Sequence, residues 1–418
     1  MRKFLGVFVL ALGFIIAACG GTAPSGGNGN NGNGGGGGGG GDVTVTVTTV
    51  TGTPTAAAYR VGDGDWQVAS DPASFSFVVG DGGNYDVAML CGFGDLRILS
   101  FTADELATPK VYCGLSSNIA TFDVDYDASD ITNASAVRLY HKNTDYEGTE
   151  ETLNTSKIGT IKETDGLAGM QDLVMLAVDN NDPPQVLAAE LISVDVANNG
   201  HYAMHKFKND PIETANFPDF GAEVPNGYTP YWVAVAVTPL GTLAYSGYGK
   251  NAGGAGNIYY IYSFATHKWF LVGASSQNSS IYTIYSSSLD TTPTISLSNP
   301  INPTVSGSTP LKFDGLSTSP DLSIYHINIF HTSFASIIYV SKAYLENSSS
   351  YEMPELTGVS GFENMSYPSG ANLIIDISEY KTNINISTFI DILNTSFNQI
   401  AIGKYIKYSN KRIEYTMP

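Results

Sequence analysis

Val43-Thr44-Val45-Thr46-Val47 alternates strictly between an apolar and a hydroxyl-bearing side chain. A period of two residues places the valines on one face of an extended strand and the threonines on the other. β-Branched residues suit such a pleated, half-buried surface. The stretch therefore predicts a β-strand with one face in a core, and it opens the folded part of the chain.

The same pattern recurs along the chain, in short apolar or alternating segments separated by Gly, Asp, Asn and Pro. Turn signals every 8 to 12 residues are typical of sandwiches. The predicted strands include 66–69, 75–79, 85–91, 96–101, 121–126, 136–141, 173–178, 186–196, 232–237, 258–262, 324–330, 337–341, 373–378, 400–408 and 412–416. We therefore expect a mainly β protein built from several consecutive antiparallel β-sandwich-like domains.

Helix signals are few. Thr102 and Glu105 have the spacing of a capping box and predict one short helix. Residues 387–398 predict another, because Phe389, Leu393 and Phe397 recur every four residues.

Composition shifts divide the chain into segments. We expect a β-sandwich domain at 42–116, a second β domain at 117–201, an aromatic-rich third β domain at 202–289, a linker rich in Pro, Ser and Thr at 290–310, and a β-sandwich domain with one short helix at 311–418.

Three cysteines separate into one near the N-terminus and a pair. Cys91 and Cys113 predict a disulfide, because two cysteines remain once Cys19 is assigned another role. With Trp66 nearby in sequence, the first domain resembles immunoglobulin-like domains in architecture, although the Cys…Trp…Cys order of true immunoglobulin domains is absent. The last domain resembles the fibronectin-like modules of bacterial surface lipoproteins in its strand pattern.

The N-terminus has the layout of a signal peptide. Arg2 and Lys3 precede an apolar run at 4–16, and Ala17 and Ala18 precede Cys19. The sequence Ile16-Ala17-Ala18-Cys19 resembles the lipobox of bacterial lipoproteins. That resemblance implies cleavage after residue 18 and lipidation of Cys19, including palmitate. The apolar run is shorter than the roughly 20 residues that cross a bilayer.

Residues 19–41 follow as a low-complexity linker of Gly and Asn, ending in an unbroken glycine run at 34–41. Such a segment has no apolar surface to bury, so we expect a flexible tether. The resemblance implies an extracytoplasmic protein anchored to the cell envelope, at the outer membrane or cell surface.

The net charge is −19, from 20 basic and 39 acidic residues. Nucleic-acid binding needs a basic footprint, so this class of partner is excluded. Anionic lipid surfaces are disfavoured for the same reason. We therefore expect membrane contact through the lipid on Cys19, and an envelope protein or a glycan as the ligand.

Asp123-Val124-Asp125-Tyr126-Asp127 is the most suggestive acidic stretch. Strand alternation puts Asp123, Asp125 and Asp127 on one face, where carboxylates can ligate Ca²⁺. The alternative is a solvated strand face, which we favour because charge runs usually face water. His201 and His205 are four residues apart, but HYAMH lacks the glutamate of a zinc-protease motif.

The third domain is rich in tyrosine and tryptophan. Aromatic side chains stack on sugars and anchor protein interfaces. The candidate binding face comprises Tyr245, Tyr248, Tyr259 and Trp269. The alternative is ordinary sheet packing.

No nucleophile-elbow, P-loop or dinucleotide-binding motif is present. The expected function is a lipid-anchored envelope protein acting as a non-catalytic binding or structural module, with no catalytic residues assigned. Two alternatives stay open: a secreted hydrolase acting on polysaccharides, whose paired carboxylates can be distant in sequence, and a Ca²⁺-stabilised surface adhesin.

Overall fold

Strands make up nearly all of the regular structure in the computed structural model. The structure describes residues 41–418 except 115–118, 143, 145–147, 182, 217–223, 251–256, 261–265, 289–296, 298, 318, 320, 347, 383 and 396–405. Helical structure in these residues comprises the 3₁₀ turn η1 (Gly92–Gly94) and two short helices, α2 (Lys342–Leu345) and α3 (Ile386–Thr395). Neither helix, within the described ranges, has the length and apolarity to span a membrane. The mainly β prediction is confirmed.

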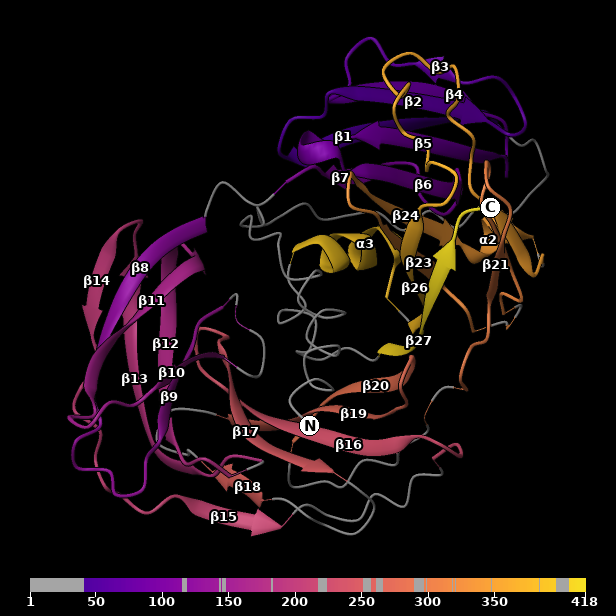
Figure 1. Ribbon diagram of the computed structural model, residues 1–418. Helices are drawn as coiled ribbons and strands as arrows, with labels where there is room; N and C mark the ends of the chain where they lie inside the picture. The colour runs from indigo at the N-terminus through magenta and orange to yellow at the C-terminus, as the bar shows by residue number, and fades with distance from the viewer. Residues whose placement is uncertain are drawn as a thin grey trace, which may run out of the picture.

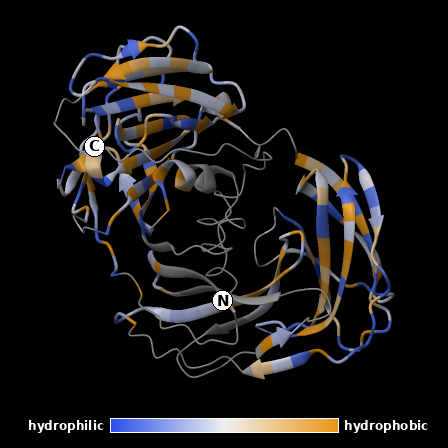
Figure 2. Ribbon diagram, turned by 180° about the vertical axis from the view of Figure 1, so that it is seen from behind, coloured by the Kyte–Doolittle hydropathy of each residue, from blue (hydrophilic) through white to orange (hydrophobic). Residues whose placement is uncertain are grey.

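The first part of the chain forms a sandwich. One sheet has the order β4 (Ser74–Val79), β1 (Val43–Thr51), β7 (Lys110–Tyr112). The facing strands are β3 (Gln67–Val68), β2 (Ala56–Val61), β5 (Asn84–Leu90) and β6 (Leu96–Thr102). In β1, Val45 and Val47 are fully buried whereas Thr44 and Thr48 are exposed, as the alternation predicts. Figure 2 shows this alternation of apolar and polar residues along the strands.

A disulfide joins the two sheets of this sandwich. Cys91 follows β5 and Cys113 follows β7, and their Cα atoms are 4.8 Å apart. The predicted bridge is confirmed. Trp66 does not pack beside it: the tryptophan is half-buried against the C-terminal core, and its Nε1 donates a hydrogen bond to the Glu355 carbonyl at 2.9 Å.

The second part forms another sandwich (Figure 1). One sheet has the order β11 (Ile158–Leu167), β8 (Ile119–Asp127), β14 (Gly200–Ala203). The other has the order β10 (Thr149–Thr152), β9 (Ala136–Tyr140), β12 (Gly169–Val178), β13 (Val186–Val196). Phe122, Val124, Leu173 and Met175 lie in the core between them.

The third part packs against the outer face of that sandwich. Its strands are β15 (Glu213–Asn216), β16 (Thr229–Val237), β17 (Leu243–Lys250), β18 (Asn257–Tyr260), β19 (Thr266–Ser275) and β20 (Ser279–Ser288). Ala236 and Tyr245 share a cluster with Val174 and Leu176 of β12. The buried Asp172 carboxylate also accepts a hydrogen bond from the Leu240 amide at 2.9 Å, which ties the β16–β17 turn to β12.

The last part completes a sheet that runs through most of the molecule. This part contributes β23 (Ile324–Phe330), β24 (Ala335–Ser341), β26 (Asn372–Thr382) and β27 (Ile406–Thr416) to that sheet, whereas β21 (Thr304–Ser306), β22 (Lys312–Asp314) and β25 (Ser350–Glu352) form a separate three-stranded sheet. The sheet that runs through the molecule has twelve strands in the order β17-β16-β19-β20-β27-β26-β23-β24-β6-β5-β2-β3. Within it, β24 pairs in parallel with β6, and β27 pairs in antiparallel orientation with β20. Strands of the predicted first, third and fourth domains are therefore joined by one hydrogen-bonded sheet.

Two helix predictions had different outcomes. Helix α3 begins one residue before the predicted 387–398 segment and otherwise lies within it. Phe389 is fully buried against the first sandwich. The side chain of Leu393 and all of Phe397 lie outside the described residues. Thr102 and Glu105 form a single turn after β6 and no helix: the Thr102 hydroxyl donates a hydrogen bond to Glu105 at 3.2 Å, and Pro109, which disfavours a helix in the residues before it, follows four residues later.

Candidate functional site

A pocket of about 470 Å³ opens where the first and last parts of the chain meet. We call it the seam pocket. It is lined by Arg60, Asp63, Pro310, Tyr344, Leu345, Ser348, Ser350, Tyr351, Glu352, Met353, Pro354 and Glu355. Two of these residues come from β2 and the turn after it, and the others come from the C-terminal part. A volume of a few hundred Å³ is within the range of small-ligand sites.

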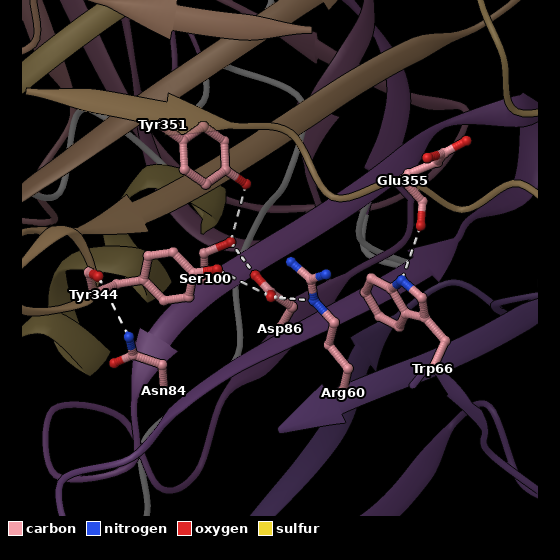
Figure 3. Close-up of polar contacts among 8 residues, drawn as sticks. All are labelled: Arg60, Trp66, Asn84, Asp86, Ser100, Tyr344, Tyr351 and Glu355. Carbon is pink, nitrogen blue, oxygen red and sulfur yellow. Dashed lines mark hydrogen bonds and ion pairs between the residues drawn. The ribbon is translucent and has the colours of Figure 1, made fainter. Parts of the chain in front are cut away.

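The wall of the seam pocket is built around the Asp86 carboxylate (Figure 3). The Arg60 Nε lies 2.7 Å from Oδ2, and the Tyr344 hydroxyl donates to the same oxygen at 3.0 Å. The Ser100 hydroxyl donates to Oδ1 at 2.6 Å, and it lies 3.0 Å from the Tyr351 hydroxyl. One carboxylate thus joins groups that are about 250 residues apart in sequence.

Strand register explains why these groups meet. Arg60 lies opposite Asp86 in the β2–β5 ladder, and Asp86 lies opposite Ser100 in the β5–β6 ladder. Ser100 in turn lies opposite Val340 of β24. Directly opposed residues on adjacent strands have their side chains on the same face. The row therefore faces the C-terminal core, whereas Tyr85 and its alternate neighbours face the first sandwich.

Burial determines the electrostatics of this wall. Asp86 is 1% exposed, and burial raises the pKa of its carboxyl, while Arg60 and the hydrogen bonds from Ser100 and Tyr344 act in the opposite direction. Burial also raises the pKa of Tyr344 and Tyr351, so both phenols stay protonated at neutral pH. Tyr344 is therefore a hydrogen-bond donor to Asp86.

Trp66 supports the Arg60 side chain. The Arg60 guanidinium carbon lies 5.3 Å from the Trp66 ring centroid, within the range of a cation–π contact. Figure 3 shows the guanidinium between the Asp86 carboxylate and this ring. With its Nε held by Asp86, the guanidinium is fixed at the pocket wall, and its side chain remains 23% exposed.

Sequence reasoning missed this site. The available signal was a single carboxylate, Asp86, inside the otherwise apolar strand predicted at 85–91. A buried carboxylate requires partners, but strand patterns do not reveal which distant strand supplies them.

The predicted calcium residues share one strand face, as expected, and are half-buried on β8; they are Asp123, Asp125 and Asp127. Asp125 lies 2.7 Å from His201 Nε2 and accepts a hydrogen bond from Thr160, which lowers the pKa of its carboxyl. Asp127 accepts hydrogen bonds from Ser129. Across the described part of the chain, no group of three or more His, Cys, Asp or Glu side chains is placed to hold a metal ion.

The predicted aromatic binding face is not supported by the positions of its members. Tyr245 is 3% and Tyr259 is 6% exposed, and both belong to the core between β12 and the third part of the chain. This corrects their assignment to an outward face: Tyr245 on β17 and Tyr259 on β18 are both buried in the cluster that packs against the second sandwich. The side chains of Tyr248 and Trp269 lie outside the described residues, as does Cys19.

Comparisons with known proteins add little. No protein-family model matches the chain, and no curated protein matches it. Among solved structures, it is similar to a crystal structure of a DUF3823 family protein from Bacteroides uniformis, with 8% identity, covering 72% of this chain and 100% of that chain, at a TM-score of 0.15. A likeness this distant carries no argument about function.

Proposed function

We propose that this protein is a lipid-anchored component of the bacterial cell envelope that binds a saccharide in the seam pocket without transforming it. The observation that carries the proposal is the seam pocket itself. Its wall combines a fixed guanidinium with serine and tyrosine hydroxyls and exposed carboxylates. Such groups hydrogen-bond the hydroxyls of a sugar, which offer both donors and acceptors.

The non-catalytic part of the proposal rests on how Asp86 is used. Arg60, Ser100 and Tyr344 all donate to its two oxygens. A carboxylate engaged by three donors organises its neighbours and is poorly placed to exchange protons with a ligand. The proposal therefore assigns Asp86 a positioning role.

The anchoring part of the proposal rests on the lipobox-like stretch ending at Cys19 and on the linker at 19–41. The Cys91–Cys113 disulfide supports it, because such bonds persist in oxidising compartments outside the cytoplasm. Growing cells fed radioactive palmitate should label the wild type and leave Cys19→Ser unlabelled. Label that persists in the variant would refute the anchor.

Ligand binding is tested by thermal shift with a panel of neutral tetrasaccharides, including the tetramers of glucose, xylose and N-acetylglucosamine. We expect at least one to raise the melting temperature of the wild type. Ser348 is exposed and lines the pocket, so Ser348→Trp should remove the shift by filling the pocket. Ser349 is exposed and does not line it, which makes Ser349→Trp the matched control.

The same samples test for catalysis. Chromatography of the recovered saccharide should show it unchanged. A shortened product would replace the binding proposal with the hydrolase alternative, and the absence of any shift across the panel would refute saccharide binding.

A further inference from the structure

We infer that the seam pocket prefers a saccharide that carries a free amine over its neutral or acidic counterpart. This inference rests on the proposed saccharide binding and adds the charge of the ligand. Two observations support it: the Arg60 guanidinium is paired with the Asp86 carboxylate, and the other charged residues that line the pocket are acidic.

The positive charge in the wall is already matched. Arg60 lies 2.7 Å from the carboxylate of Asp86, which is 1% exposed and sits behind the pocket surface. The guanidinium also lies over the Trp66 ring. The Asp86 carboxylate therefore offsets the charge of Arg60 at close range, and an anionic ligand would gain little electrostatic attraction from this arginine.

The remaining charged groups that line the pocket are all acidic. Asp63, Glu352 and Glu355 are exposed, and they come from both sides of the seam. The charged residues that line the pocket are thus three exposed acidic residues and an arginine that is paired with Asp86. An ammonium group gains from this field, and an acetylated amine does not.

A metal ion does not fit the same carboxylates. Ca²⁺ needs six to eight oxygens around one point, and none of the described residues forms a group of three or more acidic or other ligating side chains able to hold a metal. An ammonium on a sugar requires less convergence, because it has three donors that can be shared between a carboxylate, a hydroxyl and water. The chain's net charge of −19 also favours the approach of cations.

The expected preference is moderate, because exposed ion pairs are weak and screened by salt. We expect the glucosamine tetramer to bind about tenfold more tightly than the N-acetylglucosamine tetramer in calorimetry at pH 6 and low salt. The preference should shrink at 0.5 M NaCl.

Single substitutions locate the effect. Asp63→Asn and Glu352→Gln should each lower the affinity for the glucosamine tetramer about threefold and leave that for the N-acetylglucosamine tetramer unchanged. Glu151→Gln, on exposed strand β10 of the second sandwich, removes the same charge elsewhere and should change neither affinity. Equal binding of both tetramers by the wild type would overturn this inference and leave saccharide binding intact. Binding of neither tetramer, nor of any member of the neutral panel, would overturn the proposed function.

Discussion

Among single residues, Asp86 links the first and last parts of the chain through side-chain hydrogen bonds. It is buried in the middle of a strand and engages one partner from β2, one from β6 and one from α2. Local sequence rules treat an Asp in a strand as unfavourable. Here the cost of burying the carboxylate is offset by three donors, and the same contacts fix the pocket wall.

Removing that carboxylate should destabilise the fold. Asp86→Ala leaves a partly buried guanidinium and two hydroxyls without their acceptor, and we expect a loss of about 3 kcal/mol in the free energy of unfolding. Asp86→Asn keeps an acceptor without the charge that burial penalises, so it should cost less than half as much. Urea denaturation compares the two, with exposed Asp63→Asn as the control. Equal losses for Ala and Asn would contradict the role given to the hydrogen bonds.

The raised pKa of Asp86 also predicts a pH dependence. The pKa of the Asp86 carboxyl is higher in the folded state than its unfolded value of 3.8, so protonation stabilises the folded protein. This stabilisation is complete below pH 3.8 and is lost as the pH rises through the folded-state pKa. The stability difference between wild type and Asp86→Asn should therefore be larger near pH 4 than near pH 7.

His326 predicts the opposite trend on acidification. It is 4% exposed, stacks on Tyr339 with ring centroids 4.7 Å apart, and burial lowers its pKa to about 3. Because the unfolded chain binds a proton below pH 6.5 and the folded chain does not, this residue should cost about 1.4 kcal/mol of stability for each pH unit below 6.5. His326→Phe keeps an aromatic ring and should flatten the pH profile between 6.5 and 4.5. His205→Phe, at an exposed position, should leave it unchanged.

Among the secondary-structure elements, local sequence patterns correctly predicted those that short-range interactions determine. The alternation at 43–47 became β1 with Val45 and Val47 buried, and the apolar period at 387–398 became α3. The capping-box prediction at Thr102 and Glu105 was wrong, because the turn is followed by Pro109 and does not extend into a helix. The assignment of Tyr245 and Tyr259 to an outward face was wrong for a different reason: which side of a sheet faces solvent depends on what packs against it, and both tyrosines face the second sandwich.

Helix α3 depends on its N-cap. The Asn385 Oδ1 accepts a hydrogen bond from the Ser387 amide at 2.9 Å. Asn385→Ala should cost about 1 kcal/mol of unfolding free energy, and Asn385→Ser should cost only a few tenths because serine also caps. Chemical denaturation of the two variants side by side provides the measurement, and identical losses would argue against a capping role.

The disulfide should contribute through loop closure. The bridge spans 22 positions in sequence between the two sheets of the first sandwich. Replacing Cys91 and Cys113 together by alanine should lower the unfolding free energy by about 3 kcal/mol. Guanidinium titrations of the double variant and of the reduced wild type should agree, and an unchanged midpoint in both would contradict a stabilising bridge.

At the scale of the whole molecule, the pairing of β6 with β24 is the feature that strand patterns do not predict. Periodicity indicates which residues face a core, but it contains no information about which distant strand lies alongside. The first and last parts of the chain therefore look like separate domains in sequence and share one sheet in the structure. The seam pocket follows from that pairing, which is why its residues are scattered between 60 and 355.

The seam pocket is proposed to be one ligand site formed by the first and last parts of the chain. Hydrogen exchange with and without the glucosamine tetramer tests it most directly, because it reports protection segment by segment. We expect the ligand to slow amide exchange in two stretches at once, 56–63 and 342–355. Protection in only one of them, or in strands β16, β17 and β19 with neither stretch affected, would show that the seam pocket is not the ligand site.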